Sequence, residues 1–198
     1  MRPLANPLSR REAIGAVLVA GGTALGARLL GDGPDRAVSG PSARGDVEIL
    51  NFTLKLEATQ AAFYAAAVSG GALSGELGRF ASVVAGHERE HERAVRRVLG
   101  GDAEPTPRFS FGSAATDREA FTRAARNLED LCVAAYNTYA PNLTRRSLEA
   151  ALRIVAVESR HAAWIRDLAG ELPAPDAAEP RKSGPAVIAA LDRTGFVK

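Results

Sequence analysis

The chain has 198 residues, of which 46% are hydrophobic, so it can build a globular core and is not a disordered chain. Its 25 basic and 23 acidic residues give a net charge of +2, and the excess of arginine lies within residues 1–40, so the rest of the chain lacks the basic surface of a nucleic-acid-binding protein. The single cysteine excludes an internal disulfide, so stability must come from packing or from a bound metal.

Residues 1–40 are predicted to be an export signal or an N-terminal anchor. Basic residues precede an apolar, glycine-rich run over residues 13–30, as in a secretory signal. The triplet Ser9-Arg10-Arg11 resembles a twin-arginine signal. An uncleaved transmembrane anchor is the alternative, because the apolar run approaches the length that spans a bilayer. We therefore expect an exported protein, periplasmic or extracellular, that contacts a membrane only through this segment.

Apolar residues recur with helical spacing behind this leader. The first series holds Leu50, Leu54, Ala61 and Val68, and it stops at a glycine pair. The sequence Thr116-Asp-Arg-Glu119 is a capping box that would open the third helix. We expect a bundle domain over residues 41–172 with helices at about 46–70, 74–100, 116–141 and 144–170, and a Pro-rich tail over 173–198 that ends in a short helix at 186–197.

The lengths of the connections predict how these helices pair. Only a few residues join the first helix to the second and the third to the fourth, so each pair must form an antiparallel hairpin. A longer, proline-containing stretch of 16 residues separates the two pairs, and Phe109 and Phe111 would pin it to the bundle. No alternating strand pattern is present. The prediction is an all-α, ferritin-like four-helix bundle of two hairpins joined by a long crossover.

Each predicted helix carries acidic residues in its own apolar stripe. They are Glu57 in the first helix, Glu88 with His91 in the second, Glu129 in the third, and Glu158 with His161 in the fourth. Charged carboxylates are almost never buried unpaired, since an unpaired one costs several kcal/mol. Four carboxylates in one core therefore require positive charge among them, and two divalent cations would neutralise them.

These acidic positions repeat along the chain. The first helix reads "LEATQAAFY" and the third "LEDLCVAAY", while the second contains "EREH" and the fourth "ESRH", so the chain is two copies of one hairpin. Together with "DVEILNFTLKLEATQAAFY" and "VESRHAAWIR", these segments resemble the ferritin-like domain family, which includes exported bacterial proteins and desiccation-related proteins. The resemblance covers about residues 46–170.

The resemblance implies a site for two iron or manganese ions. Its ligands would be Glu57, Glu88, His91, Glu129, Glu158 and His161. Carboxylates and imidazoles without a thiolate suit iron or manganese better than copper or structural zinc. Such ions would support ferroxidase-like, peroxidase-like or catalase-like oxidoreductase chemistry, although the lack of a Cys-x-x-Cys pair argues against a rubrerythrin-type peroxidase. Metal ions are the expected partners, nucleic acid is not, and a homo-oligomer is left open.

Four further side chains are candidates for contact with the ligands: Tyr64, Tyr136, Cys132 and His87. Both tyrosines lie seven residues after a predicted ligand, where packing is the alternative role. The default role of Cys132 is a small buried apolar residue. His87 is one position off the apolar stripe, so it is expected to be exposed or to touch a ligand. Trp164 is expected to pack in the core.

Two other functions are compatible with parts of the sequence. The letters His87-Glu-x-x-His91 also spell a zinc-protease helix. We disfavour that function because Ala94 and Val98 occupy the positions of the extended motif, and because it leaves the second Glu-x-x-His unexplained. The protease needs His87 as a ligand, whereas the ferritin-like site predicts that His87→Ala leaves metal content nearly unchanged. The other alternative is a non-catalytic bundle that acts in envelope stress or binds a partner.

Overall fold

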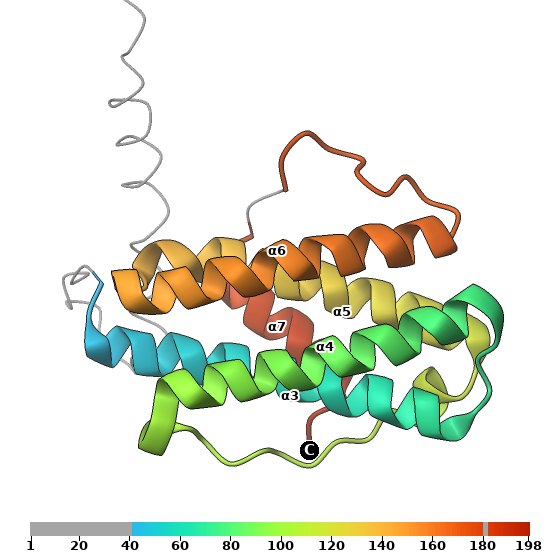
Figure 1. Cartoon of the computed structure of the whole chain (residues 1–198), viewed down its shortest axis with the longest axis horizontal. Helices are drawn as coiled ribbons and strands as arrows, with labels where there is room; N and C mark the ends of the chain where they lie inside the picture. Colours follow the sequence, from blue (N-terminus) through green and yellow to red (C-terminus); the bar gives the residue numbers. More distant parts are fainter. Residues whose placement is uncertain (1–40, 180–181) are drawn as a thin grey trace, which may run out of the picture.

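The computed structural model describes residues 41–179 and 182–198 of the chain. Four long helices run side by side, and a short fifth helix crosses behind them (Figure 1). Their bounds are α3 Ala43–Gly70, α4 Gly75–Leu99, α5 Arg118–Tyr139, α6 Arg145–Leu168 and α7 Gly184–Thr194, with 3-10 turns at η1 Gly100–Asp102, η2 Gly112–Ala115 and η3 Ala140–Asn142. The described residues form no strand, which confirms the predicted all-α fold. The predicted export signal lies outside the described residues.

The helix starts differ from the predicted ones by a few residues. α3 begins at Ala43, ahead of the predicted start, because Ser42 caps it by accepting a hydrogen bond from the Gly45 amide at 3.1 Å. The predicted cap of α5, Thr116, is wrong by one position. The cap is Asp117, which accepts from the Ala120 amide at 2.8 Å, while the Thr116 amide is engaged in the preceding turn with Ser113.

Two antiparallel hairpins, α3 with α4 and α5 with α6, form the bundle as predicted (Figure 1). Asp46 in the first turn of α3 joins them. Its carboxylate accepts hydrogen bonds from the Thr144 amide at 2.8 Å and from the Ser147 hydroxyl at 2.6 Å, both at the start of α6. The Thr144 amide is one of the backbone donors at the start of a helix that have no intrahelical partner, so Asp46 of the first hairpin caps the helix that begins the return of the second.

The crossover between the hairpins is attached at both of its ends. Near its start, the side-chain amide of Asn51 donates to the Asp102 carbonyl at 2.9 Å and accepts from the Glu104 amide at 2.8 Å. Near its end, Phe111 packs edge-on against Phe63, with ring centroids 5.5 Å apart. The predicted pinning by Phe111 is therefore confirmed, whereas Phe109 stacks on Phe111 rather than on the bundle itself.

The C-terminal segment also holds the crossover in place. α7 buries Val187 and Leu191 and packs on α5. It ends at Thr194, short of the predicted end, because Gly195 takes a left-handed conformation with φ of 63°. The last residues then run along the crossover, where Phe109 and Val197 form an isolated antiparallel bridge. The chain end is thus part of the packed structure.

The core consists of two apolar clusters separated by a polar layer. One cluster contains Leu56 and Leu131, and the other contains Phe63 and Leu128. Along every helix of the bundle, the acidic residue singled out in the sequence lies between the two clusters. The polar layer is therefore closed on both sides by hydrocarbon.

Trp164 and Val68 lie outside the polar layer, and both were expected to pack in the core. Trp164 packs edge-on against Phe80 at 5.2 Å, in agreement with its expected packing role. Val68, expected in the stripe of α3, lies in the last turn of that helix and is 45% exposed, whereas the preceding Ala67 is fully buried. No helix among the described residues is both long and apolar enough to cross a membrane.

Candidate metal centre

The six predicted ligand residues meet in the polar layer. Their side chains are buried: the four carboxylates are 0% exposed, His91 is 8% exposed and His161 is 3% exposed. α3 and α5 each contribute one glutamate, and α4 and α6 each contribute a Glu-x-x-His pair. Residues three apart on a helix lie on the same face about one turn apart, so each pair presents both of its side chains to the bundle axis.

The six side chains form two overlapping groups. In each group the ligand atoms lie within 4.8 Å of one another, which is close enough for all of them to hold one metal ion. The groups are Glu57, Glu88, His91 and Glu158, and Glu88, Glu129, His161 and Glu158. Glu88 and Glu158 belong to both groups, so the two groups share these carboxylates. We call these groups the Glu57–His91 half and the Glu129–His161 half.

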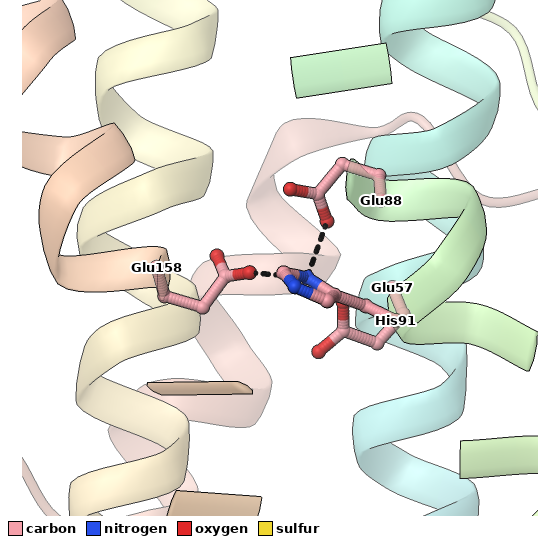
Figure 2. Close-up of side chains that lie close together, drawn as sticks. All are labelled: Glu57, Glu88, His91 and Glu158. Carbon is pink, nitrogen blue, oxygen red and sulfur yellow. Dashed lines mark ion pairs between the residues drawn. The ribbon is translucent and has the colours of Figure 1, made fainter. Parts of the chain in front are cut away.

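The imidazole of His91 lies among the three carboxylates of its half (Figure 2). Its Nδ1 is 2.7 Å from Glu158 Oε1, 3.5 Å from Glu57 Oε2 and 3.7 Å from Glu88 Oε2. The other half is arranged in the same way. Nδ1 of His161 is 3.2 Å from Glu88 Oε1 and 3.4 Å from Glu129 Oε2. Both histidines therefore turn Nδ1 inward and Nε2 outward.

The atoms that face inward have no hydrogen-bond partners among the described residues. They are Oε2 of Glu57 and Glu129, both carboxylate oxygens of Glu88 and Glu158, and Nδ1 of both histidines. The histidine–carboxylate contacts have the distances of ion pairs but not the angles of hydrogen bonds. A buried polar atom without a partner is costly, so eight of them converging on one layer fit a centre that binds metal. The donor set is oxygen-rich with two imidazole nitrogens, which suits iron or manganese.

Burial and mutual repulsion perturb the protonation of this cluster. Burial raises the pKa of Glu88 from 4.5 to about 7, and burial followed by the charge of Glu88 raises the pKa of Glu158 well above its usual value. For the histidines, burial acts to lower the pKa, but the surrounding carboxylates outweigh it. They raise the pKa of His91 to about 12 and that of His161 to about 10. The metal-free cluster therefore holds protons that a metal ion must displace.

Two tyrosines donate hydrogen bonds to the outward oxygens of Glu57 and Glu129, the glutamates that belong to one half only. Each tyrosine lies on the helix opposite its glutamate. Tyr136 of α5 donates to Oε1 of Glu57 on α3 at 2.6 Å, and Tyr64 of α3 donates to Oε1 of Glu129 on α5. Burial, together with these carboxylates, raises the pKa of both phenols well above 10, so both remain protonated donors. Both tyrosines therefore contact residues that the sequence predicts to be ligands.

Two further side chains contact the same oxygens. Gln60 donates from Nε2 to Glu129 Oε1 at 3.1 Å, and the Cys132 thiol lies 3.7 Å from Glu57 Oε1. Gln60 was not among the residues selected from the sequence. The internal repeat contained the signal, because Gln60 lies three residues after Glu57, as Cys132 lies three residues after Glu129.

His87 is exposed, yet its ring lies against the centre from outside. Its Nδ1 is 2.9 Å from Nε2 of His161, and the two rings stack with centroids 5.2 Å apart. Burial, followed by the charge of His161, lowers the pKa of His87, which keeps it neutral near pH 7. His87 belongs to neither group of atoms that can hold a metal. A zinc-protease helix would need His87 as a ligand, and this arrangement gives that function no support.

Comparison with known families agrees with this geometry. The family model described as "ferritin-like domain" matches residues 45–171, which is more than half of the chain and includes all six residues of the two halves. No protein with curated annotation matches the chain significantly.

Proposed function

The chain belongs to the ferritin-like domain family, and we propose that it binds two iron or manganese ions in the buried centre and reacts them with dioxygen or peroxide. The observation that carries the proposal is the set of eight inward oxygen and nitrogen atoms without hydrogen-bond partners among the described residues. Removing these side chains from water is costly, and among the described residues the two histidines offset the charge of the four carboxylates only in part.

The number of ions follows from the charge and from the sharing of ligands. Four carboxylates carry four negative charges when ionised, and two divalent cations neutralise them. Glu88 and Glu158 belong to both groups, so two neighbouring ions would share them, while Glu57 and His91 would complete one ion and Glu129 and His161 the other. When bound, a pair of redox-active ions supplies electrons to dioxygen or peroxide.

The protein's own residues would control this chemistry. The two apolar clusters exclude water from both ends of the centre. Tyr136 and Tyr64 hold the outward oxygens of Glu57 and Glu129, which leaves Oε2 of each glutamate as the inward ligand atom. The centre consists of buried carboxylates and imidazoles, which bind metal ions rather than an organic substrate. The proposed substrate is therefore ferrous iron itself, with dioxygen or peroxide as the oxidant.

The stoichiometry of metal binding tests the first part of the proposal. Chelator-treated protein is reconstituted with Fe²⁺ or Mn²⁺ without oxygen, desalted and measured by elemental analysis. We expect close to two ions per chain. Glu149→Ala is the matched control, since Glu149 is a glutamate of α6 whose partner is the surface residue Arg145, and it should keep both ions. One tightly held zinc ion and no second ion would refute the dinuclear centre.

Oxygen consumption tests the second part. Ferrous iron added to aerobic protein should be oxidised faster than in buffer, with oxygen uptake in proportion to the protein. Glu158→Ala should abolish the acceleration, because Glu158 belongs to both halves of the centre. A protein that binds two ions but accelerates no oxidation, with dioxygen or with peroxide, would instead be a non-catalytic, metal-stiffened bundle. We further propose that the protein acts outside the cytoplasm, on the basis of the signal-like composition of residues 1–40.

A further inference from the structure

The two halves of the centre are related by the sequence repeat, but their surroundings differ at two positions. Glu57 is followed after three residues by Gln60, whereas Glu129 is followed after three residues by Cys132. The two shared glutamates differ in the preceding residue, which is His87 before Glu88 and Val157 before Glu158. Gln60 of α3 contacts Glu129 of α5, and His87 of α4 contacts His161 of α6. Both polar members of these pairs therefore act on the Glu129–His161 half.

Glu129 is held more firmly than Glu57. Its Oε1 accepts from Tyr64 and from the side-chain amide of Gln60 at 3.1 Å. The matching oxygen of Glu57 accepts from Tyr136, but its second neighbour is the Cys132 thiol at 3.7 Å, and a thiol is a weak donor. Two donors on Oε1 draw charge from that oxygen. The inward ligand atom is Oε2, however, so the contacts mainly fix the orientation of Glu129.

His161 also has an outer partner, the ring of His87. A metal ion at Nδ1 leaves the ring proton on Nε2, and in His161 this nitrogen lies 2.9 Å from the acceptor Nδ1 of His87. Among the described residues, none is hydrogen-bonded to Nε2 of His91, and the repeat places the hydrocarbon side chain of Val157 at the position that corresponds to His87. Outer hydrogen bonds fix the tautomer and ring orientation of a ligating histidine and raise its basicity.

We propose that Gln60 and His87 are positioning residues that make the Glu129–His161 half bind its metal ion more tightly than the Glu57–His91 half. This inference rests on the proposed metal-binding function. Removal of an outer hydrogen bond to a ligand typically lowers metal affinity by about 10- to 100-fold. The two ions should therefore bind in two separate steps, and the first step should fill the Glu129–His161 half.

The order of filling is tested by calorimetric titration of metal-free full-length protein with Mn²⁺ at constant pH. Wild-type protein should show a tight step and a weaker step, each of one ion per chain. Glu57→Gln and Glu129→Gln form a matched pair, since each converts to an amide the carboxylate that belongs to one half only. Glu57→Gln should keep the tight step, and Glu129→Gln should lose it. The reverse result would overturn the inference.

The roles of the positioning residues are tested with His87→Ala, which changes an exposed side chain and leaves the packed core intact. The tight step should weaken by about 10- to 100-fold, although two ions should still bind at saturation. His87→Asn should restore most of the affinity, because its side-chain oxygen replaces the acceptor Nδ1. Val157→Ala, at the equivalent position of the repeat, should leave both steps unchanged. Gln60→Leu should weaken the tight step in the same way as His87→Ala.

The outcomes separate this inference from the proposed function. Two equal Mn²⁺ steps in wild-type protein would overturn the inequality of the halves, while the dinuclear centre would stand. An unchanged tight step in both His87→Ala and Gln60→Leu would overturn the positioning roles. Absence of Mn²⁺ binding to wild-type protein would refute the metal centre and this inference with it. The urea midpoint of each metal-free variant shows whether a weakened step reflects loss of folding instead, and a shifted midpoint matching the affinity loss would overturn the positioning role.

Discussion

Metal-free protein should lose stability as the pH rises from 5 to 8, and Glu88 should be a main cause. Burial raises the pKa of Glu88 from 4.5 to about 7 in the folded protein, while in the unfolded chain it returns to 4.5. Between these values the folded state binds more protons than the unfolded state, so the free energy of unfolding falls with rising pH. The contribution is fully present below 4.5 and is lost as the pH passes through 7.

The size of the effect follows from the shift. A change from 4.5 to about 7 corresponds to roughly 3 kcal/mol, most of which falls between pH 5 and 8. For a chain of this size, that loss lowers the melting temperature by roughly 5 to 10 °C. The raised pKa values of His91 and His161 act in the same direction above pH 6.5, because the folded state keeps protons that the unfolded state has released.

The assay is urea unfolding of chelator-treated protein at pH 5, 6, 7 and 8, with Glu88→Gln as the paired variant. The amide of glutamine does not titrate, so the variant should lose roughly 2 to 3 kcal/mol less than wild-type protein over this range. Bound metal should reverse the trend, because the ligands must be deprotonated to bind it and its stabilisation therefore grows with pH. Identical pH slopes for metal-free wild-type protein and Glu88→Gln would refute the reasoning.

Three other outcomes are expected. Glu158→Ala should lose at least one ion and the rise in melting temperature that added metal gives wild-type protein, whereas Glu149→Ala should keep both; an unchanged metal content in Glu158→Ala would contradict the shared ligand role. Asp46→Ala should lower the free energy of unfolding by about 2 kcal/mol, because it leaves the buried Ser147 hydroxyl and the partly buried Thr144 amide at the start of α6 without this partner; a change below about 0.5 kcal/mol in urea unfolding would argue against this role. A fusion of residues 1–45 to a reporter that folds before export should leave the cytoplasm, and Arg10→Lys with Arg11→Lys should abolish this; export that survives both changes would point to the general secretory route or an anchor.

The sequence by itself determined the bundle and the composition of its polar layer. Helical periodicity, glycine pairs and connection lengths are local signals, and they were sufficient for two hairpins and a crossover. The Glu-x-x-His spacing puts both side chains of a pair on one face of a helix, and the repeat shows that Glu57 and Glu129 belong with these pairs. Acidic residues in an otherwise apolar stripe must meet at the axis of the bundle, because every helix turns that stripe inward.

Only the tertiary structure decided how the two halves differ. The contacts of Gln60 with Glu129 and of His87 with His161 join residues 69 and 74 positions apart, and they depend on the rotation and pairing of different helices. Periodicity along one helix assigns a residue to a face, but it does not say which side chain on another helix that residue will touch. The pairing of the chain end with the crossover at Phe109 was missed for the same reason, since one bridge leaves no strand pattern in the sequence. Local spacing therefore specified which residues form the centre, and the packing of helices specified how firmly each of them is held.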